Sequence, residues 1–200
     1  LSTLQHMDRI LVFEKGERKA VVLSMIHYGD RNFYDVMFDK IQQENSLVLL
    51  EGVMDKNGLF GDTGPYPETR YGLTSQFGTF NNWVKKEKAF INSDIDVSEL
   101  DEDVRKYMVA EFHNSSIAEK ATASTEEKAR IQSLEDRQMA IRNHRIIENF
   151  DRIESENKTV IFTWGAVHTP FIVKALEERG YKKTASFEQR AIGFWYSPLL

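Results

Sequence analysis

Residues 159–171 read TVIFTWGAVHTPF, which is an apolar run followed by a glycine, a histidine and Thr-Pro. A short run that is apolar on both faces is typical of a strand buried inside a sheet. Thr-Pro is a common helix start, because proline at the first position gives up no helical hydrogen bond. Residues 20–30, AVVLSMIHYGD, repeat nearly the same order. Together the two stretches predict two buried strands, each followed directly by a histidine and then a helix.

The N-terminal third of the chain predicts a strand, helix, strand unit. Residues 9–27, RILVFEKGERKAVVLSMIH, place two apolar runs around a short Gly-containing turn, which indicates a hairpin. After Asp30, apolar residues recur at helical spacing. Residues 46–52, SLVLLEG, form a third apolar run that ends at Glu51. This order predicts parallel pairing of the second and third runs through a right-handed crossover.

The remaining segments complete a single predicted α/β (α+β) domain over residues 1–200. Residues 55–69 are rich in Gly, Pro, Asp and Asn and predict a loop. A helical insertion is expected at about 70–125, with Asp96 or Ser98 as a helix cap. A long helix is expected from about 125 to 154, then the strand at 159, a helix ending at Gly180 and a terminal hairpin. The fold predicted is a central mixed sheet with parallel core strands, flanking helices and this insertion.

Composition limits the classes of partner. The 200 residues are 41% apolar and carry a formal charge of -5, with basic residues interleaved among acidic ones, so we expect no nucleic-acid partner. There is no cysteine, which excludes disulfides and thiolate metal sites. No leader or membrane-spanning run is recognisable. Because the sequence begins with Leu1 rather than methionine, membrane anchoring by a segment outside these residues is an open alternative.

Three apolar runs stop at ionisable side chains, namely His27, Glu51 and His168. Ligands of open α/β sheets bind beyond the carboxyl ends of the strands, so these three groups are expected to converge. Two imidazoles and one carboxylate suit a divalent transition metal such as Mn, Co or Zn. A metal held there lowers the pKa of bound water or polarises a carbonyl, which is hydrolytic chemistry.

Arg142 extends this set, because it falls on the apolar stripe of the long helix and needs an anionic partner. It could stabilise an oxyanion or orient Glu51. Two other interpretations stay open. A histidine, His27 or His168, and Glu51 could share acid and base work on a bound water without a metal. Equally, strand-end histidines are often structural, and an arginine on an apolar stripe is often simply ion-paired.

The same residues resemble the TraB/GumN/Tiki superfamily, which is related to erythromycin-esterase and ChaN haem-uptake proteins. LSMIHYGDRNFYDVM is similar to the family's first Gly-x-x-His motif, with Ser24 in place of the usual glycine. LVLLEG resembles its strand ending in glutamate, IRNHRIIENF its arginine helix, and WGAVHTPFIVKALEERGY its second Gly-x-x-His motif. The resemblance implies site residues at His27, Glu51, Arg142 and His168.

This resemblance implies an EreA/ChaN-like fold and, for the Tiki branch, a metalloprotease that depends on Mn or Co. The leading hypothesis is therefore a metal-dependent hydrolase acting on a peptide or small-molecule substrate. A second hypothesis is a binding protein that captures a peptide or haem without turnover. The absence of Cys-x-x-Cys-His excludes the usual covalent attachment of haem. A third is a silent scaffold in which the same groups form only an ion-paired network around Arg142.

Overall fold

The structure is a computed structural model that describes residues 8–61, 68–70, 72–113 and 123–191. The chain divides into two compact units, each described below by itself. The first unit comprises Leu1–Glu51, Pro65–Ser93 and Ile146–Leu200, and the second comprises Gly52–Gly64 and Asp94–Arg145. Among the described residues no helix is long and apolar enough to cross a membrane.

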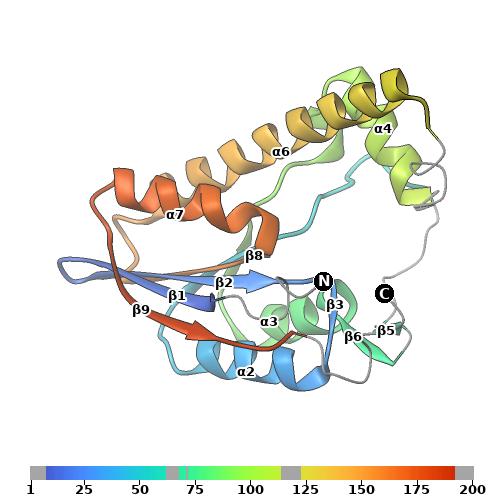
Figure 1. Cartoon of the computed structure of the whole chain (residues 1–200). Coiled ribbons are helices and arrows are strands. Elements are labelled where there is room, and N and C mark those ends of the chain that lie inside the picture. Colours follow the sequence, from blue (N-terminus) through green and yellow to red (C-terminus); the bar gives the residue numbers. More distant parts are fainter. Residues whose placement is uncertain (1–7, 62–67, 71, 114–122, 192–200) are drawn as a thin grey trace. The chain divides into compact units, whose positions relative to one another are not determined.

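A six-stranded mixed sheet forms the centre of the first unit, in the order β7-β4-β8-β2-β1-β9 (Figure 1). Four neighbours, β7, β4, β8 and β2, run parallel, whereas β1 is antiparallel to both β2 and β9. A smaller three-stranded sheet has the order β3-β6-β5. The mixed α/β class with parallel core strands is thus confirmed. The strands are β1 (Asp8–Lys15), β2 (Arg18–Met25), β3 (Tyr28–Gly29), β4 (Leu47–Leu50), β5 (Thr69–Arg70), β6 (Leu73–Ser75), β7 (Phe90–Asn92), β8 (Thr159–Gly165) and β9 (Lys182–Glu188).

The predicted hairpin is β1 and β2, joined by a two-residue turn in which Gly16 has a φ of 60°. The expected direct pairing of β2 with β4 is wrong. Both strands are parallel to β8, which lies between them. The reason is that β8, which is buried from Val160 to Gly165, is covered on both faces and takes the central position. Of the expected terminal hairpin, β9 is described and pairs with β1, while residues 192–200 lie outside the described residues.

Helices cover both faces of this sheet (Figure 1). On one face α2 (Arg31–Gln42) and α3 (Asn81–Glu87) bury residues such as Phe33, Met37 and Val84 against the strands. On the other face α7 (Thr169–Glu178) and the last turns of α6 (Thr125–Ile153) bury Phe150 and Leu176. Strand residues alternate between the two clusters, as pleated geometry requires.

Helix boundaries agree closely with the sequence signals. The long helix α6 and the helix after Asp30 are confirmed, and Gly180, with a φ of 82°, follows the end of α7. The Asp30 side chain makes no capping hydrogen bond. Thr169 is the first residue of α7 rather than its cap, because the 3-10 turn η3 (Ala166–His168) leads directly into the helix.

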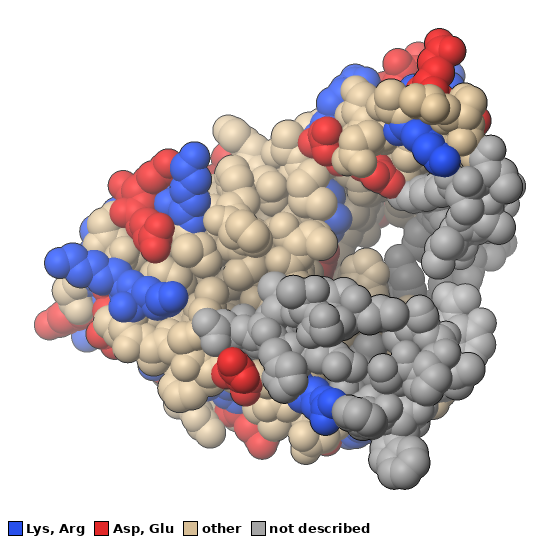
Figure 2. Space-filling model, viewed as in Figure 1, with Lys and Arg blue, Asp and Glu red and all other residues tan. Residues whose placement is uncertain are grey.

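The second unit packs α4 (Glu102–His113) and residues 125–145 of α6 around a small apolar cluster that includes Val104 and Leu134. Asp96 is a cap as expected, but of the short 3-10 turn η2 (Val97–Glu99): it accepts from the Ser98 N–H at 3.0 Å while Glu99 accepts from the Asp96 N–H at 2.9 Å. On the face of the molecule shown in Figure 2, Lys and Arg residues stand in mixed groups with Asp and Glu. Such mixing favours local ion pairs over a field of one sign.

Candidate functional site

The carboxyl ends of three neighbouring parallel strands carry the residues singled out by sequence. In the sheet, Leu50 of β4 is level with Thr163 of β8, and Met25 of β2 is level with Gly165 of β8. Glu51 follows β4 directly, and His168 comes three residues after β8. His27 comes two residues after β2. The three residues therefore leave the same edge of the sheet from adjacent strands.

Glu51 and His168 are brought together in the interior. Their side chains are 2% and 1% exposed, and Oε1 of Glu51 lies 3.7 Å from Nε2 of His168. The other carboxylate oxygen, Oε2, accepts from the Gly165 backbone N–H at 2.8 Å and from the Gln76 amide at 3.3 Å. A carboxylate held by such donors has a fixed orientation. Glu51 is therefore a buried acidic group aimed at an imidazole.

Gly165 binds Glu51 through its backbone, and neither its conformation nor the space around it requires a glycine. Its φ is -50°, which any residue adopts. A Cβ atom on residue 165 would lie 3.4 Å from Oε2 and 3.5 Å from Oε1 of Glu51, which is ordinary van der Waals contact. The contribution of residue 165 to the site is therefore the N–H that it donates to Oε2 of Glu51.

His168 is fixed by its neighbours on β8 and α7. The Trp164 ring meets the imidazole edge-on, with centroids 5.0 Å apart, and Trp164 Nε1 donates to Ser93 Oγ at 2.9 Å. Ser24, which stands where the resembled family has glycine, is buried and shares a 2.8 Å hydrogen bond with the Thr169 hydroxyl. This bond joins the end of β2 to the first residue of the helix after His168.

His27, in contrast, is exposed. Its ring packs against Phe77 with centroids 5.1 Å apart, and its backbone carbonyl accepts from the Gln76 N–H at 2.9 Å. The preceding residue is anchored by Tyr34, whose hydroxyl donates to the Ile26 carbonyl at 2.6 Å. Burial, with a contribution from Tyr28, raises the pKa of Tyr34 well above its ordinary range. The turn that carries His27 is thus tied to α2, while its imidazole faces solvent.

The donor set does not form a three-ligand metal site as the side chains stand. Within the described ranges no group of three or more His, Asp and Glu side chains lies close enough to hold an ion. Glu51 and His168 supply two suitable donors side by side. These two residues are of the types that bind transition metals, whereas the exposed His27 side chain does not join them.

Arg142 has the anionic partner that its position on the apolar stripe demands, and this partner is Asp94. Its Nε and one terminal nitrogen bind the two carboxylate oxygens at 3.0 and 2.7 Å, in a bidentate pair. The side chains are 13% and 0% exposed. Asp94 also accepts from the backbone N–H groups of Gly52 at 3.2 Å and Ile95 at 2.9 Å. Arg142 thus holds the chain segment that begins directly after Glu51.

Sequence reasoning missed three residues of these arrangements: Asp94, Gln76 and Asn81. Asp94 follows the short strand β7 by two residues, so a strand-end carboxylate was a signal, but a three-residue strand gives little periodicity. Gln76 and Asn81 bind Glu51 through side-chain amides, and Asn81 Nδ2 donates to the Glu51 carbonyl at 3.0 Å. Both lie in the predicted helical insertion, where no site residue was expected.

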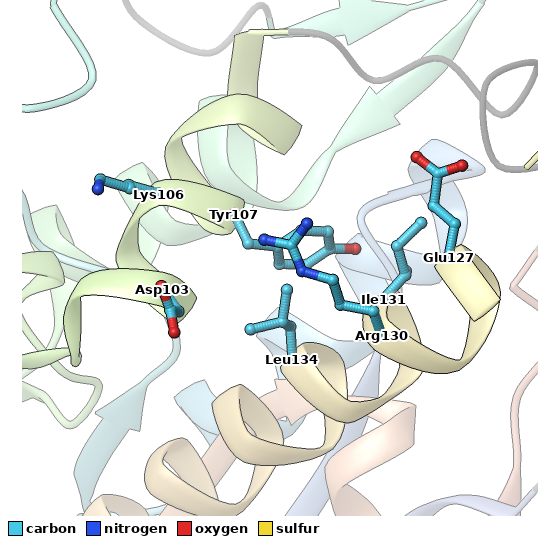
Figure 3. A pocket seen from close by; sticks show the side chains of 7 residues that line it. All are labelled: Asp103, Lys106, Tyr107, Glu127, Arg130, Ile131 and Leu134. Atoms are coloured by element: carbon cyan, nitrogen blue, oxygen red, sulfur yellow. The ribbon is translucent and has the colours of Figure 1, made fainter.

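A separate cavity lies between α4 and α6 in the second unit (Figure 3). Its volume is about 250 Å³, and it contains none of the residues predicted from sequence. Opposite charges surround an apolar floor, so the cavity favours no single sign of ligand. The lining residues are Asp103, Lys106, Tyr107, Glu127, Arg130, Ile131 and Leu134.

No protein-family model, curated protein or solved structure matches the chain.

Proposed function

We propose that the chain is a metal-dependent hydrolase that cleaves peptide substrates with a site built on Glu51, His168 and His27. One observation carries the proposal: a buried carboxylate and imidazole lie 3.7 Å apart where parallel strands end. This edge is where α/β sheets bind their ligands. Membership of the TraB/GumN/Tiki superfamily, with an EreA/ChaN-like fold, is part of the same proposal.

In the alternative without a metal, the Glu51 and His168 pair supplies the acid and base. Because two donors occupy Oε2 of Glu51, Oε1 is the oxygen that faces His168. A carboxylate and an imidazole can divide the proton transfers of hydrolysis, one taking a proton from water and the other giving one to the leaving group. Their burial strengthens such interactions by excluding bulk water.

A divalent Mn, Co or Zn ion would be held by Glu51 and His168, with His27 as the third donor once its side chain turns inward from its surface position against Phe77. Nitrogen and oxygen donors of this kind suit those metals. When bound, the ion would supply a water of lowered pKa or a polarised carbonyl. Arg142 supports the site through the chain, because it holds Asp94 and Asp94 holds the Gly52 N–H next to Glu51.

The test is peptide cleavage and metal content, measured with and without a chelator. We expect cleavage that requires Mn or Co, and loss of both metal and activity in His27→Ala and His168→Ala. His144→Ala is the matched control, because His144 is an exposed histidine outside the site. It should retain metal and activity.

Three other results would change the proposal in different ways. Full activity in chelator would leave a hydrolase that uses Glu51 and His168 without a metal. No cleavage together with a defined Soret band on haem titration would favour a haem-binding protein. No cleavage and no binding of Mn, Co, peptide or haem would leave the strand-end residues with a structural role.

A further inference from the structure

Two side-chain amides from one short segment donate hydrogen bonds to Glu51. Gln76 Nε2 donates to the Glu51 carboxylate at 3.3 Å, and Asn81 Nδ2 donates to the Glu51 backbone carbonyl at 3.0 Å. Gln76 is 0% exposed and Asn81 is 4% exposed. These contacts also fix which way each amide faces, because Oε2 of Glu51, which accepts the Gly165 N–H as well, and the Glu51 backbone carbonyl are both acceptors.

This orientation leaves two acceptors inside the protein. Among the described residues, no donor reaches Oε1 of Gln76 or Oδ1 of Asn81, although both atoms are buried. Buried polar atoms in proteins are nearly always hydrogen-bonded, to protein or to ordered water. Two such oxygens on residues that both bind Glu51 therefore point to a donor outside the residues that the structure describes.

The backbone explains why both amides are on the same side. Residues Gln76–Phe80 form a π-helical turn, η1, in which the Asn81 N–H donates to the Gln76 carbonyl. Residues five apart lie one π turn from each other, whereas an α-helix would turn them away from each other. Ser75 stabilises the turn by accepting the Gly78 N–H at 3.0 Å. Single π turns are frequent at functional sites.

We propose that Gln76 and Asn81 bind water next to the Glu51 carboxylate, and that this water is consumed in the hydrolysis. Water fits this position because it is small enough for a buried site and has two O–H groups to donate to buried acceptors. That this water is consumed in hydrolysis rests on the proposed function. Gln76 and Asn81 also act as positioning residues, since they fix the carboxylate and the backbone of Glu51.

With no metal on Glu51 and His168, the reaction step balances as an ordinary hydrolysis. The water oxygen forms a bond to the peptide carbonyl carbon and gives a proton to the Glu51 and His168 pair. The C–N bond then breaks, and the pair returns a proton to the leaving amine nitrogen. Glu51 and His168 end in their starting protonation state, and the products are a carboxylic acid and an amine.

A high-resolution crystal structure tests the water site without reference to activity. We expect ordered water within hydrogen-bond distance of Gln76 Oε1 and Asn81 Oδ1, and its loss from the Gln76→Met variant. Protein donors on both oxygens, or a dry contact, would overturn the proposal. Gln132→Met, on an exposed residue, is the matched control for folding and crystallisation.

Kinetics test the role of the water separately. For Gln76→Met and Asn81→Leu we expect kcat to fall by on the order of 10²-fold, because the reacting water loses its position. KM should stay within about twofold, because neither side chain is proposed to bind the peptide. Gln132→Met, on an exposed residue outside the site, should leave both constants unchanged. A raised KM with unchanged kcat would overturn the role. If the wild type cleaves no peptide, the proposed function fails while the crystal structure still decides the water site.

Discussion

Glu51 and Asp94 are both buried carboxylates that follow paired strands of one sheet, yet their partners differ in kind. Asp94 is bound by the guanidinium of Arg142, which carries its charge at every pH a protein survives. Glu51 is bound by neutral amides and faces the imidazole of His168, which can gain or lose a proton.

The difference separates a structural carboxylate from a chemical one. A permanently charged partner has no proton to exchange with its carboxylate, whereas an imidazole neighbour allows a proton to move between the two groups. Burial alone does not distinguish them, because both acids are nearly inaccessible to solvent. What a buried acid can do is therefore better judged from its partners than from its exposure.

The comparison predicts its largest effect at Asp94. Asp94→Ala removes the carboxylate that makes both bonds to the Arg142 guanidinium, and breaking a buried ion pair from one side costs about 3–5 kcal/mol. Denaturant unfolding should show this loss. Asp35→Ala is the control, since its pair with Arg31 is exposed and should cost less than about 1 kcal/mol. An equal loss in the two variants would contradict the distinction.

Glu51 should give the opposite phenotype. Glu51→Gln keeps an oxygen that can accept the Gly165 N–H, so we expect unfolding free energy to change by no more than about 1 kcal/mol. Hydrolysis should fall by on the order of 10²-fold or more in kcat, because the group that takes the proton is gone. Parallel measurement of stability and turnover checks both. A variant that unfolds easily yet keeps its kcat would make Glu51 another structural acid.

A smaller effect is expected from adding a methyl group beside the Glu51 carboxylate. Gly165→Ala is allowed by the backbone, and its Cβ would stand 3.4 Å from Oε2 of Glu51, which is an ordinary van der Waals contact. Replacing glycine by alanine at a position with compatible dihedral angles stabilises a protein by about 0.4–1 kcal/mol. Peptide cleavage should be unchanged, because the variant keeps the backbone N–H that binds Glu51. A lower melting temperature or reduced cleavage would contradict this expectation.

The smallest change in unfolding free energy is expected at Glu44, a partly exposed carboxylate that serves as a reference for the two buried ones. Burial alone would raise its pKa, but hydrogen bonds and charges from Lys19 and then Lys40 outweigh burial and lower it. A lowered folded-state pKa stabilises above the unfolded value of 4.5, and this stability is lost as pH falls through the folded pKa. Glu44→Gln should therefore cost about 1 kcal/mol or less near neutral pH, and nothing once both states are protonated. Unfolding curves across this range measure the difference.

The sequence was sufficient to predict the main helices and strands, and to predict that His27, Glu51 and His168 follow the ends of strands. Apolar periodicity in α2, α6 and α7 and the two-sided burial of β8 are local properties, so local patterns report them. The insertion of β8 between β2 and β4 is not local, because pairing joins residues far apart in the chain.

The fine geometry of the site was beyond local patterns for other reasons. A π turn such as Gln76–Phe80 has no composition of its own, so the shared face of Gln76 and Asn81 could not be anticipated. Whether a histidine points inward depends on its packing. Trp164 holds His168 in the interior, whereas His27 lies at the surface against Phe77.

The buried hydroxyl of Tyr34 provides an optical signal from the segment that carries His27. Because its pKa is raised above the ordinary value of 10.0, this phenol should stay un-ionised in alkali where exposed tyrosines form phenolate. Its ultraviolet phenolate absorbance would then develop only when the bond to the Ile26 carbonyl opens. The stability linked to this group is complete below pH 10.0 and is lost as pH rises toward the folded pKa. An alkaline titration of wild type against Tyr34→Phe would thus measure how firmly the loop before the proposed site is held.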